Sequence, residues 1–358
     1  MSDLDNLASI NKKGAVLLGE LVSCDGVGEG AKHFVFSHIH VDHVGGGTGG
    51  VCLGDTVYDS FHLGQVYVSK PTSELLQAIA NDNFSGKEQF HPIEYGEKGE
   101  QELNVEGIIE KLQLIESSHV LGASQILVYS MNHDKHVLYS GDISSKDRPP
   151  RDVDVLVVDS THGSPQFDDE ANEQSTRQQF FAELKIQLMK EHKSVAIHAS
   201  RGILQEVMSL VSNEPEFDNF QLLSIKQDIA ASKIYQKYGY KMREVVDIHS
   251  DEGEDIKDDD HESIFFTPAP QPTYHEKVGT DYGIYFDSYV SGYELLKSNN
   301  KTRFKENSHA NFSSLINYIE STNAELVIVD NYRTKQGPKL VEQLKARDIN
   351  AECQPVFG

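Results

Sequence analysis

The sequence predicts an α/β protein built from two parts, and three observations support that fold class. Up to about residue 160 the chain has many short β-rich runs and few long helices between them, which favours the packing of one sheet on another. After Gly163, strand patterns alternate with amphipathic helical patterns, which is typical of a parallel sheet. The 358 residues are enough for one large domain or two modest ones with real cores.

A series of short strands and one helix is predicted in the first part. The helix is expected at 72–81, where Thr72 or Ser73 can accept hydrogen bonds from the free N–H groups of the first turn. Asp134 and Lys135 read as a hairpin turn between two strands. The strands are expected at 15–21, 34–37, 65–68, 112–116, 125–129, 136–139 and 155–158.

Strands and helices alternate in the second part. The expected helices are 173–192, 203–212 and 228–238, and the expected strands are 194–198 and 220–224. The segment 251–262 holds eight carboxylates and one lysine, which is typical of a solvated loop or linker. Beyond it, a helix, a strand and a second helix are expected at 311–321, 325–330 and 337–347.

Composition narrows the functional classes. The net charge of 32 − 56 = −24 disfavours non-specific nucleic-acid binding, which depends on neutralising phosphates, although the acidic segment carries part of the excess. The three cysteines lie far apart and form no CxxC pair, which argues against a disulfide scaffold or a cysteine-rich zinc site. We see no membrane-length apolar run and no secretory signal, so we expect a cytoplasmic protein with no membrane partner.

The most informative stretch is His-Ile-His-Val-Asp-His, at residues 38–43. Side chains two apart point the same way in an extended backbone, so His38 and His40 can converge on one metal ion. Asp42 and His43 follow where a strand turns into a glycine-rich loop, and they can reach a second ion. Packing alone does not explain this density of histidine and aspartate, so the spacing predicts a two-metal hydrolase.

Three residues at strand or helix ends can complete such a site. His119 and Asp142 each follow a predicted strand, and His309 precedes a predicted helix. Taken singly, each has an ordinary alternative: a surface histidine, a turn aspartate and a residue of a helix N-terminus. Their combination with the 38–43 motif favours metal binding.

Together these motifs resemble the metallo-β-lactamase superfamily, and further matches resemble its β-CASP nuclease family. The 38–43 motif is similar to the superfamily signature, with His119 as the third histidine and Asp142 as the bridging aspartate. Residues 158–163 resemble the acidic-Ser-Thr-aromatic-Gly element that opens the β-CASP insertion. Residues 196–202 are similar to the strand-then-Gly-Arg element inside that insertion, and Ser308-His309-Ala310-Asn311 looks like the family's Ser-Ala-His-Ala-Asp motif.

The resemblance implies an αββα sandwich core with a smaller α/β domain inserted into it. Residues 1–163 and 286–358 would form the metallo-β-lactamase-like core, so both ends of the chain contribute to it. The β-CASP-like insertion would span 164–285 and include the acidic loop at 250–262. The active site is expected in a cleft between the two domains.

The resemblance also implies two zinc ions, with manganese or iron as alternatives. The expected ligands are His38, His40, His119 and Asp142 for the first ion, and Asp42, His43, Asp142 and His309 for the second. Asp25 and Asp159 would support ligand histidines from behind. Asp330 stands where the RNA-processing, RNase J-like branch usually has a final histidine and the DNA-repair branch has valine, so it either ligates a metal or supports a ligand.

The implied activity is phosphodiester hydrolysis by a metal-activated hydroxide, as in an RNA-processing exo- or endonuclease. Single-stranded nucleic acid is the expected partner, with RNA favoured over DNA. Asp42, His309 and Asp159 are the candidate catalytic residues. The scissile or flanking phosphates would be seated by Ser200, Arg201, Arg333 and Lys335.

Other interpretations stay open. A DNA nuclease of the same family fits because contacts to the 2′-OH cannot be recognised in this sequence. A metallo-hydrolase of a small thioester, lactone or phosphodiester would share the core but would need neither the insertion nor His309. A non-catalytic binding subunit would be expected to lose ligands that this sequence keeps. A homodimer is equally open.

Overall fold

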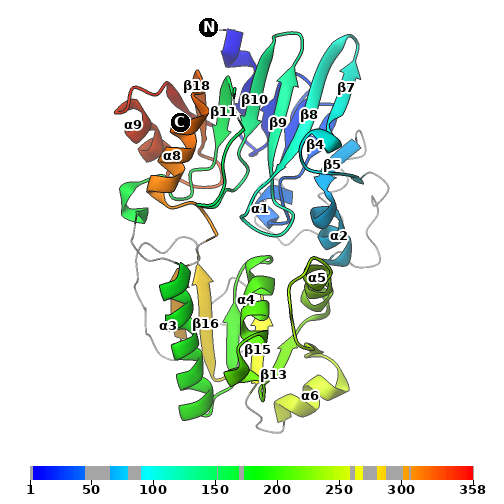
Figure 1. Cartoon of the computed structure of the whole chain (residues 1–358), viewed down its shortest axis with the longest axis vertical. Coiled ribbons are helices and arrows are strands. Elements are labelled where there is room, and N and C mark those ends of the chain that lie inside the picture. The colour runs from blue at the N-terminus through cyan, green and yellow to red at the C-terminus, as the bar shows by residue number, and fades with distance from the viewer. Residues whose placement is uncertain are drawn as a thin grey trace. The chain divides into compact units, whose positions relative to one another are not determined.

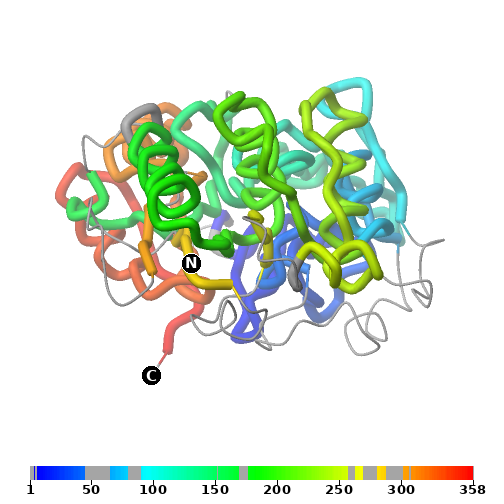
Figure 2. Tube along the Cα trace, turned by 90° about the horizontal axis from the view of Figure 1, so that it is seen from below, coloured from blue at the N-terminus to red at the C-terminus, as the bar shows by residue number. Residues whose placement is uncertain are grey.

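The computed structural model describes most of the chain, in two compact units. The described residues are 3–44, 65–79, 90–150, 152–168, 173–258, 263–268, 280–287, 301–305 and 308–357. The first unit comprises Met1–Asp168 with Ser308–Gly358, and the second comprises Asp169–Asn307. Figure 1 labels the elements, and Figure 2 follows the chain from the blue N-terminal strands through the green and yellow second unit to the red C-terminal end.

The first unit is a sandwich of two sheets. Within the described residues, one sheet has the strand order β1-β2-β3-β4-β5-β6 and the other β19-β18-β11-β10-β9-β8-β7. The first sheet consists of Ala8–Ile10, Val16–Leu18, Val22–Cys24, His33–Val35, Gln65–Ser69 and Phe90–Ile93, in chain order. The second consists of Gln101–Val105, Ile108–Glu116, Ser124–Ser130, Lys135–Tyr139, Val155–Val158, Leu326–Asp330 and Ala351–Gln354.

The first unit has four layers, which pack through side chains that alternate between the two faces of each strand. Val137 and Tyr139 of β10 face the apolar core between the sheets, whereas Leu138 faces the opposite side. Helices α8 (Phe312–Thr322) and α9 (Gly337–Lys345) cover that side of the second sheet (Figure 1). Helix α2 (Lys70–Ile79) contacts β5 and β6 of the first sheet. The order helix–sheet–sheet–helix confirms the predicted α/β sandwich.

The chain returns to the first unit after a long excursion. Strand β18 pairs in parallel with β11, and β19 pairs in parallel with β18, so the C-terminal segment completes the second sheet. The sequence predicts this return near residue 286. In the structure β16 (Tyr282–Asp287) and β17 (Lys301–Lys305) pair with each other in the sheet of the second unit, and the first unit resumes at Ser308.

The second unit contains a parallel sheet in the order β14-β13-β15-β12-β16-β17. Its other strands are Val195–His198 (β12), Gln221–Ser224 (β13), Val246–Asp247 (β14) and Ser263–Thr267 (β15), and its helices include Glu173–Lys185 (α3), Ile203–Ser212 (α4) and Lys226–Lys237 (α5). The predicted strand–helix alternation is confirmed. Among the described residues of both units, no helix combines the length and apolarity needed to cross a membrane.

The segment predicted as an acidic loop is partly helical. Helix α6 spans Asp251–Asp258. Ser250 precedes it, and its Oγ accepts a hydrogen bond from Gly253 N at 3.1 Å, while its carbonyl accepts one from Glu254 N at 2.9 Å. Carboxylates in the first turn also interact favourably with the positive end of the helix dipole. The loop prediction is therefore wrong for these residues, because the serine cap and acidic first turn outweigh the charge density.

Candidate metal centre

The metal motif lies at an edge of the sandwich where several strands end. Strand β10 is parallel to β11, and β9 is antiparallel to both β8 and β10, so β8, β10 and β11 run in one direction. Their carboxyl ends therefore share one edge of the second sheet. His119, Asp142 and Asp159 follow these three ends, and the 38–43 motif follows β4 of the other sheet.

Close backbone contacts fix the loops at this edge. Ser124 N donates a hydrogen bond to Ser37 O at 2.9 Å, which joins the two sheets. Gly141 lies at φ +54°, and a Cβ there would come within 2.7 Å of Ser124 O. Glycine alone tolerates both conditions, so the chain can turn directly from β10 into Asp142.

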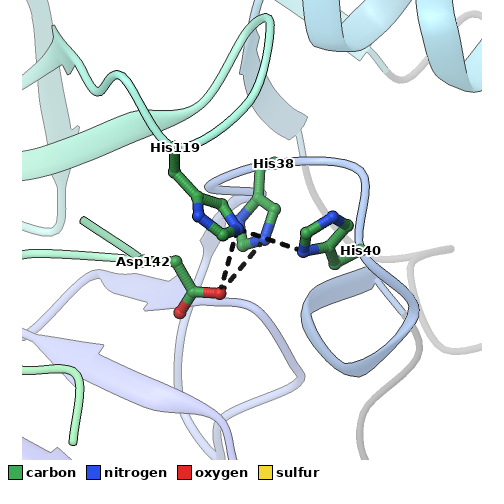
Figure 3. Close-up of side chains that lie close together, drawn as sticks. All are labelled: His38, His40, His119 and Asp142. Atoms are coloured by element: carbon green, nitrogen blue, oxygen red, sulfur yellow. Dashed lines mark hydrogen bonds and ion pairs between the residues drawn. The ribbon is translucent and has the colours of Figure 1, made fainter. Parts of the chain in front are cut away.

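The first group of converging side chains is His38, His40, His119 and Asp142 (Figure 3). Asp142 Oδ2 lies 3.4 Å from His38 Nε2 and 3.4 Å from His119 Nε2. His119 Nε2 lies 3.2 Å from His40 Nδ1. A tetrahedral zinc ion with bonds of about 2.1 Å separates its ligands by about 3.4 Å, so these atoms are spaced as ligands of one ion would be.

Two buried ring nitrogens without hydrogen-bond partners indicate whether a metal ion fits this site. Nε2 of His38 and Nε2 of His43 are buried and have no hydrogen-bond partner among the described residues. A buried polar atom left without a partner costs roughly 1–3 kcal/mol. Both nitrogens face Asp142, with Nε2 of His43 lying 3.3 Å from Oδ1. A cation between these imidazoles and the carboxylate would remove the penalty, so the residues fit a metal site.

A second group extends from the same aspartate. His309 Nε2 lies 3.9 Å from Asp142 Oδ2, and a ligand atom of Asp159 also falls within this group. Asp42 Oδ2 lies 3.7 Å from His43 Nε2, and its side chain is 52% exposed. Asp142 is therefore the carboxylate that both groups share.

A buried carboxylate orients His43 from behind. Asp25 Oδ2 accepts hydrogen bonds from His43 Nδ1 at 2.7 Å, from Ser37 Oγ at 2.7 Å and from Tyr139 OH at 2.9 Å. Asp25 Oδ1 accepts one from Ser37 N at 2.7 Å. Because Nδ1 of His43 carries this proton, its Nε2 can present a lone pair toward Asp142.

Similar hydrogen bonds orient the remaining histidines. His309 Nδ1 lies 3.2 Å from Asp159 Oδ2, and Thr161 donates to the other oxygen through both N and Oγ1. His119 Nδ1 donates to the carbonyl of Ser308 at 3.2 Å. Nδ1 of His38 lies 2.9 Å from Ser37 Oγ. These contacts orient His309, His119 and His38, and the acceptors on Asp159 and Ser308 fix the tautomers of His309 and His119.

The electrostatics suit a cation. Burial opposes ionisation of Asp142, but the neighbouring charges of His43 and His309 hold its pKa well below the usual value. Burial and then His309 lower the pKa of His119 to about 4, and burial lowers the pKa of His38. The pKa of His43 is raised by Asp142 against the effect of burial, so a cation would displace a proton there.

Two other predicted site residues pair with each other. Arg333 Nη1 donates to Asp330 Oδ2 at 2.6 Å, and the side chains are 5% and 4% exposed. Arg333 Nη2 also donates to the carbonyls of Gly14 and Asp25. Among the described residues, Asp330, like Asp42 and His43, lies outside both groups of converging ligand atoms. The structure pairs the charge of Asp330 with that of Arg333 and keeps the Arg333 guanidinium away from the surface, and a ligand role for Asp330 stays a prediction.

The remaining predicted phosphate contacts lie in different units. Lys335 is exposed in the first unit. Ser200 and Arg201 follow β12 in the second unit, where Arg201 Nε donates to the fully buried Asp228 at 2.8 Å. The structure describes each unit by itself, so these three residues stay predictions.

Several supporting residues escape recognition in the sequence. Tyr139 reaches Asp25 across 114 positions, and no local pattern predicts that contact. Asp147, a further buried carboxylate at this edge, likewise belongs to no motif in the sequence. Ser37 directly precedes the histidine motif, and that position is a signal that could have drawn attention to it.

Comparison with known proteins gives distant similarities. No family model matches the chain. An "RNase J-like protein" of Methanocaldococcus jannaschii is 24% identical over 263 residues, which cover 66% of this chain and 58% of that protein. The chain thus spans little more than half of that relative. An uncharacterized protein of Acidianus ambivalens, named for its place in a "lig 3'region", is 32% identical over 111 residues, 28% of this chain and 71% of that protein.

A solved structure shares the fold. A protein of unknown function from Enterococcus faecalis aligns with a TM-score of 0.55 at 13% identity, over 91% of this chain and 80% of that chain. At this identity the likeness concerns the fold alone. The chain therefore combines an α/β sandwich fold, a buried histidine–aspartate cluster able to hold metal ions, and a distant similarity to an RNase J-like protein.

Proposed function

We propose that this chain is a metal-dependent phosphodiester hydrolase of the β-CASP type, a nuclease that acts on single-stranded RNA. The observation that carries the proposal is the position of Asp142. Its Oδ1 faces His43, while its Oδ2 faces His38 and His119 and lies 3.9 Å from His309 Nε2. One carboxylate shared between two sets of imidazoles is what a pair of metal ions requires. The similarity to an RNase J-like protein supports a nucleic-acid substrate.

The proposed cofactor is a pair of zinc ions, with manganese or iron as alternatives. The first ion would be held by His38, His40, His119 and Asp142, and the second by Asp42, His43, Asp142 and His309. Such a pair activates water for attack on phosphorus and neutralises charge on the phosphoryl oxygens.

The protein itself orients the imidazoles that would ligate the metal ions. Asp25 and Asp159 accept the Nδ1 protons of His43 and His309, which leaves both Nε2 atoms available. Most of the cluster is buried, but Asp42 is half exposed. We therefore place the substrate phosphate on the side of the cluster that carries Asp42.

Substrate binding must rely on local positive charge, because the chain as a whole carries a net charge of −24. We propose that Lys335, Ser200 and Arg201 contact the flanking phosphates. Asp228 fixes the Nε edge of Arg201, which would orient the guanidinium for such a contact. Arg333 is left out, because it is buried against Asp330.

The test is cleavage of end-labelled single-stranded RNA and DNA of one sequence, with zinc or manganese added. The wild type is compared with His40→Ala and with His133→Ala, which removes a part-exposed histidine at the β9–β10 hairpin. We expect metal-dependent RNA cleavage that is lost in His40→Ala and kept in His133→Ala. Preferential cleavage of DNA would show that the substrate is DNA and not RNA. If the protein binds metal but cleaves neither RNA nor DNA, the proposal of a nuclease is overturned and hydrolysis of a small molecule is favoured.

A further inference from the structure

Asp147 is a buried carboxylate that lies five positions after Asp142 in the loop following β10. Its residue is 6% exposed. Its Oδ1 accepts a hydrogen bond from Ser118 N at 2.7 Å, and its Oδ2 accepts bonds from Ser117 Oγ at 2.8 Å and Ser144 N at 2.8 Å. We infer that Asp147 is a positioning residue that ties together the loops carrying three of the proposed metal ligands.

The first of these loops carries His119. Ser117 and Ser118 directly precede this histidine, and His119 N lies 3.3 Å from Ser117 Oγ. Ser117 N donates to Ala123 O at 2.9 Å, which closes the loop between β8 and β9. By binding both serines, Asp147 fixes the backbone immediately before the imidazole.

The second loop carries Asp142 itself. Ser117 Oγ lies 2.9 Å from the carbonyl of Asp142 and 2.8 Å from Asp147 Oδ2, so its one proton is shared between acceptors on both aspartates. Asp147 also accepts Ser144 N, and Asp147 N donates to Ser144 O at 3.1 Å. These bonds hold the turn that follows Asp142 in one conformation.

The third segment carries His309. The carbonyl of Ile143 accepts a hydrogen bond from Ala310 N at 2.7 Å, and Ser145 Oγ accepts one from Asn311 N at 3.2 Å. Both acceptors lie in the turn that Asp147 stabilises. The position of the segment after His309 therefore depends on the same carboxylate, although Asp147 does not contact His309 itself.

An amide cannot replace this carboxylate. Both oxygens of Asp147 face N–H donors, Ser118 N on one side and Ser144 N on the other. In Asp147→Asn, either orientation of the amide would place its NH₂ group against one of these donors. One buried N–H would lose its partner and the turn would shift, while the volume of the side chain would stay nearly the same.

The inference rests on the metal-binding part of the proposed function, so the test measures metal binding and not cleavage. Metal content and affinity, from competition with a chelator, are compared for wild type, Asp147→Asn and the milder Ser117→Ala. Glu110→Gln is the matched control, because Glu110 is fully buried in the same unit and accepts Glu20 N and Leu21 N. Thermal unfolding of the metal-free proteins reports stability separately.

We expect Asp147→Asn to weaken metal binding about 10–100-fold, as loss of a ligand-supporting group typically does, and Ser117→Ala to weaken it less. Glu110→Gln should lower the unfolding temperature and keep the wild-type affinity. Equal affinity losses in Asp147→Asn and Glu110→Gln would overturn the positioning role, as would two ions bound normally by Asp147→Asn. If Asp147→Asn does not fold, wild-type affinity in Ser117→Ala overturns it. A wild type without metal would instead overturn the proposed function.

Discussion

The two halves of the histidine–aspartate cluster, one for each proposed ion, are held in place by different kinds of group. In the first half, His38 is oriented by the hydroxyl of Ser37, and His119 is oriented by the main-chain carbonyl of Ser308. Both supports are neutral, and a main-chain carbonyl cannot be removed by substitution. The imidazoles of the first half are therefore in direct contact with neutral supports, and the carboxylate of Asp147 acts on this half only through the backbone before His119.

In the second half, carboxylates provide the support. His43 is oriented by Asp25 and His309 by Asp159, and both carboxylates are buried. A carboxylate behind an imidazole fixes its tautomer and raises its basicity as a ligand. A change at Asp159 should therefore weaken the second half and leave the first intact, whereas Asp25 also holds Ser37, which orients His38 of the first half.

The largest effect should come from the residue that both halves share. Asp142→Ala removes the only carboxylate that faces His38, His119 and His43 together among the described residues, so both proposed ions should be lost. Cleavage should fall more than about a hundredfold, because metal ions stabilise the transition state by several kcal/mol. Elemental analysis and the RNA cleavage assay measure this. Asp134→Asn, at the exposed β9–β10 turn, is the control, and normal metal content in Asp142→Ala would break the comparison.

The next effect separates the halves. Asp42→Ala removes a proposed ligand of the second ion whose side chain is 52% exposed. The free energy of unfolding should change by no more than about 0.5 kcal/mol, as for most surface substitutions. Metal content should fall by about one ion per chain, and cleavage should be lost, since both ions are needed. Full turnover by the folded variant contradicts the assignment.

A stability effect distinguishes support from ligation. Asp330→Ala leaves the guanidinium of Arg333 buried without its carboxylate, and breaking a buried ion pair in this way costs about 3–5 kcal/mol. Denaturant unfolding should show that loss, while the folded protein keeps both ions. An Asp330→Ala variant that lost one ion at unchanged stability would make Asp330 a ligand after all.

The smallest effects concern the support of His309. Asp159→Asn should weaken binding of the second ion by about 10–100-fold and leave the first ion unchanged. Thr161→Val removes only the hydroxyl that donates to Asp159, so its effect should be smaller still. Metal titration followed by calorimetry measures both. Equal weakening of the two ions would remove the distinction between the halves.

Much of the fold could be predicted because its signals are local. The strand at 155–158 and the helix at 203–212 match their predicted bounds, since apolar periodicity marks both. The convergence of His38, His40 and His119 also follows from their strand-end positions. Local sequence patterns do not determine which distant residues contact each other in the folded chain.

Contacts across space were harder to predict. The sequence left Asp330 open as a ligand or a support, because its partner Arg333 is recognised only by their contact in the folded chain. Asp147 carries no motif, and its partners Ser117 and Ser118 lie about 30 positions away along the chain. The high charge of the segment that forms helix α6 led to the prediction of a loop, although Ser250 marks the start of the helix.

The central claim is that Asp142 lies between two metal ions. Diffraction from crystals grown with zinc, recorded at the zinc absorption edge, tests it most directly. We expect two anomalous peaks, about 3.5–4 Å apart, both beside the carboxylate of Asp142. One peak alone, or two peaks away from Asp142, would contradict the account.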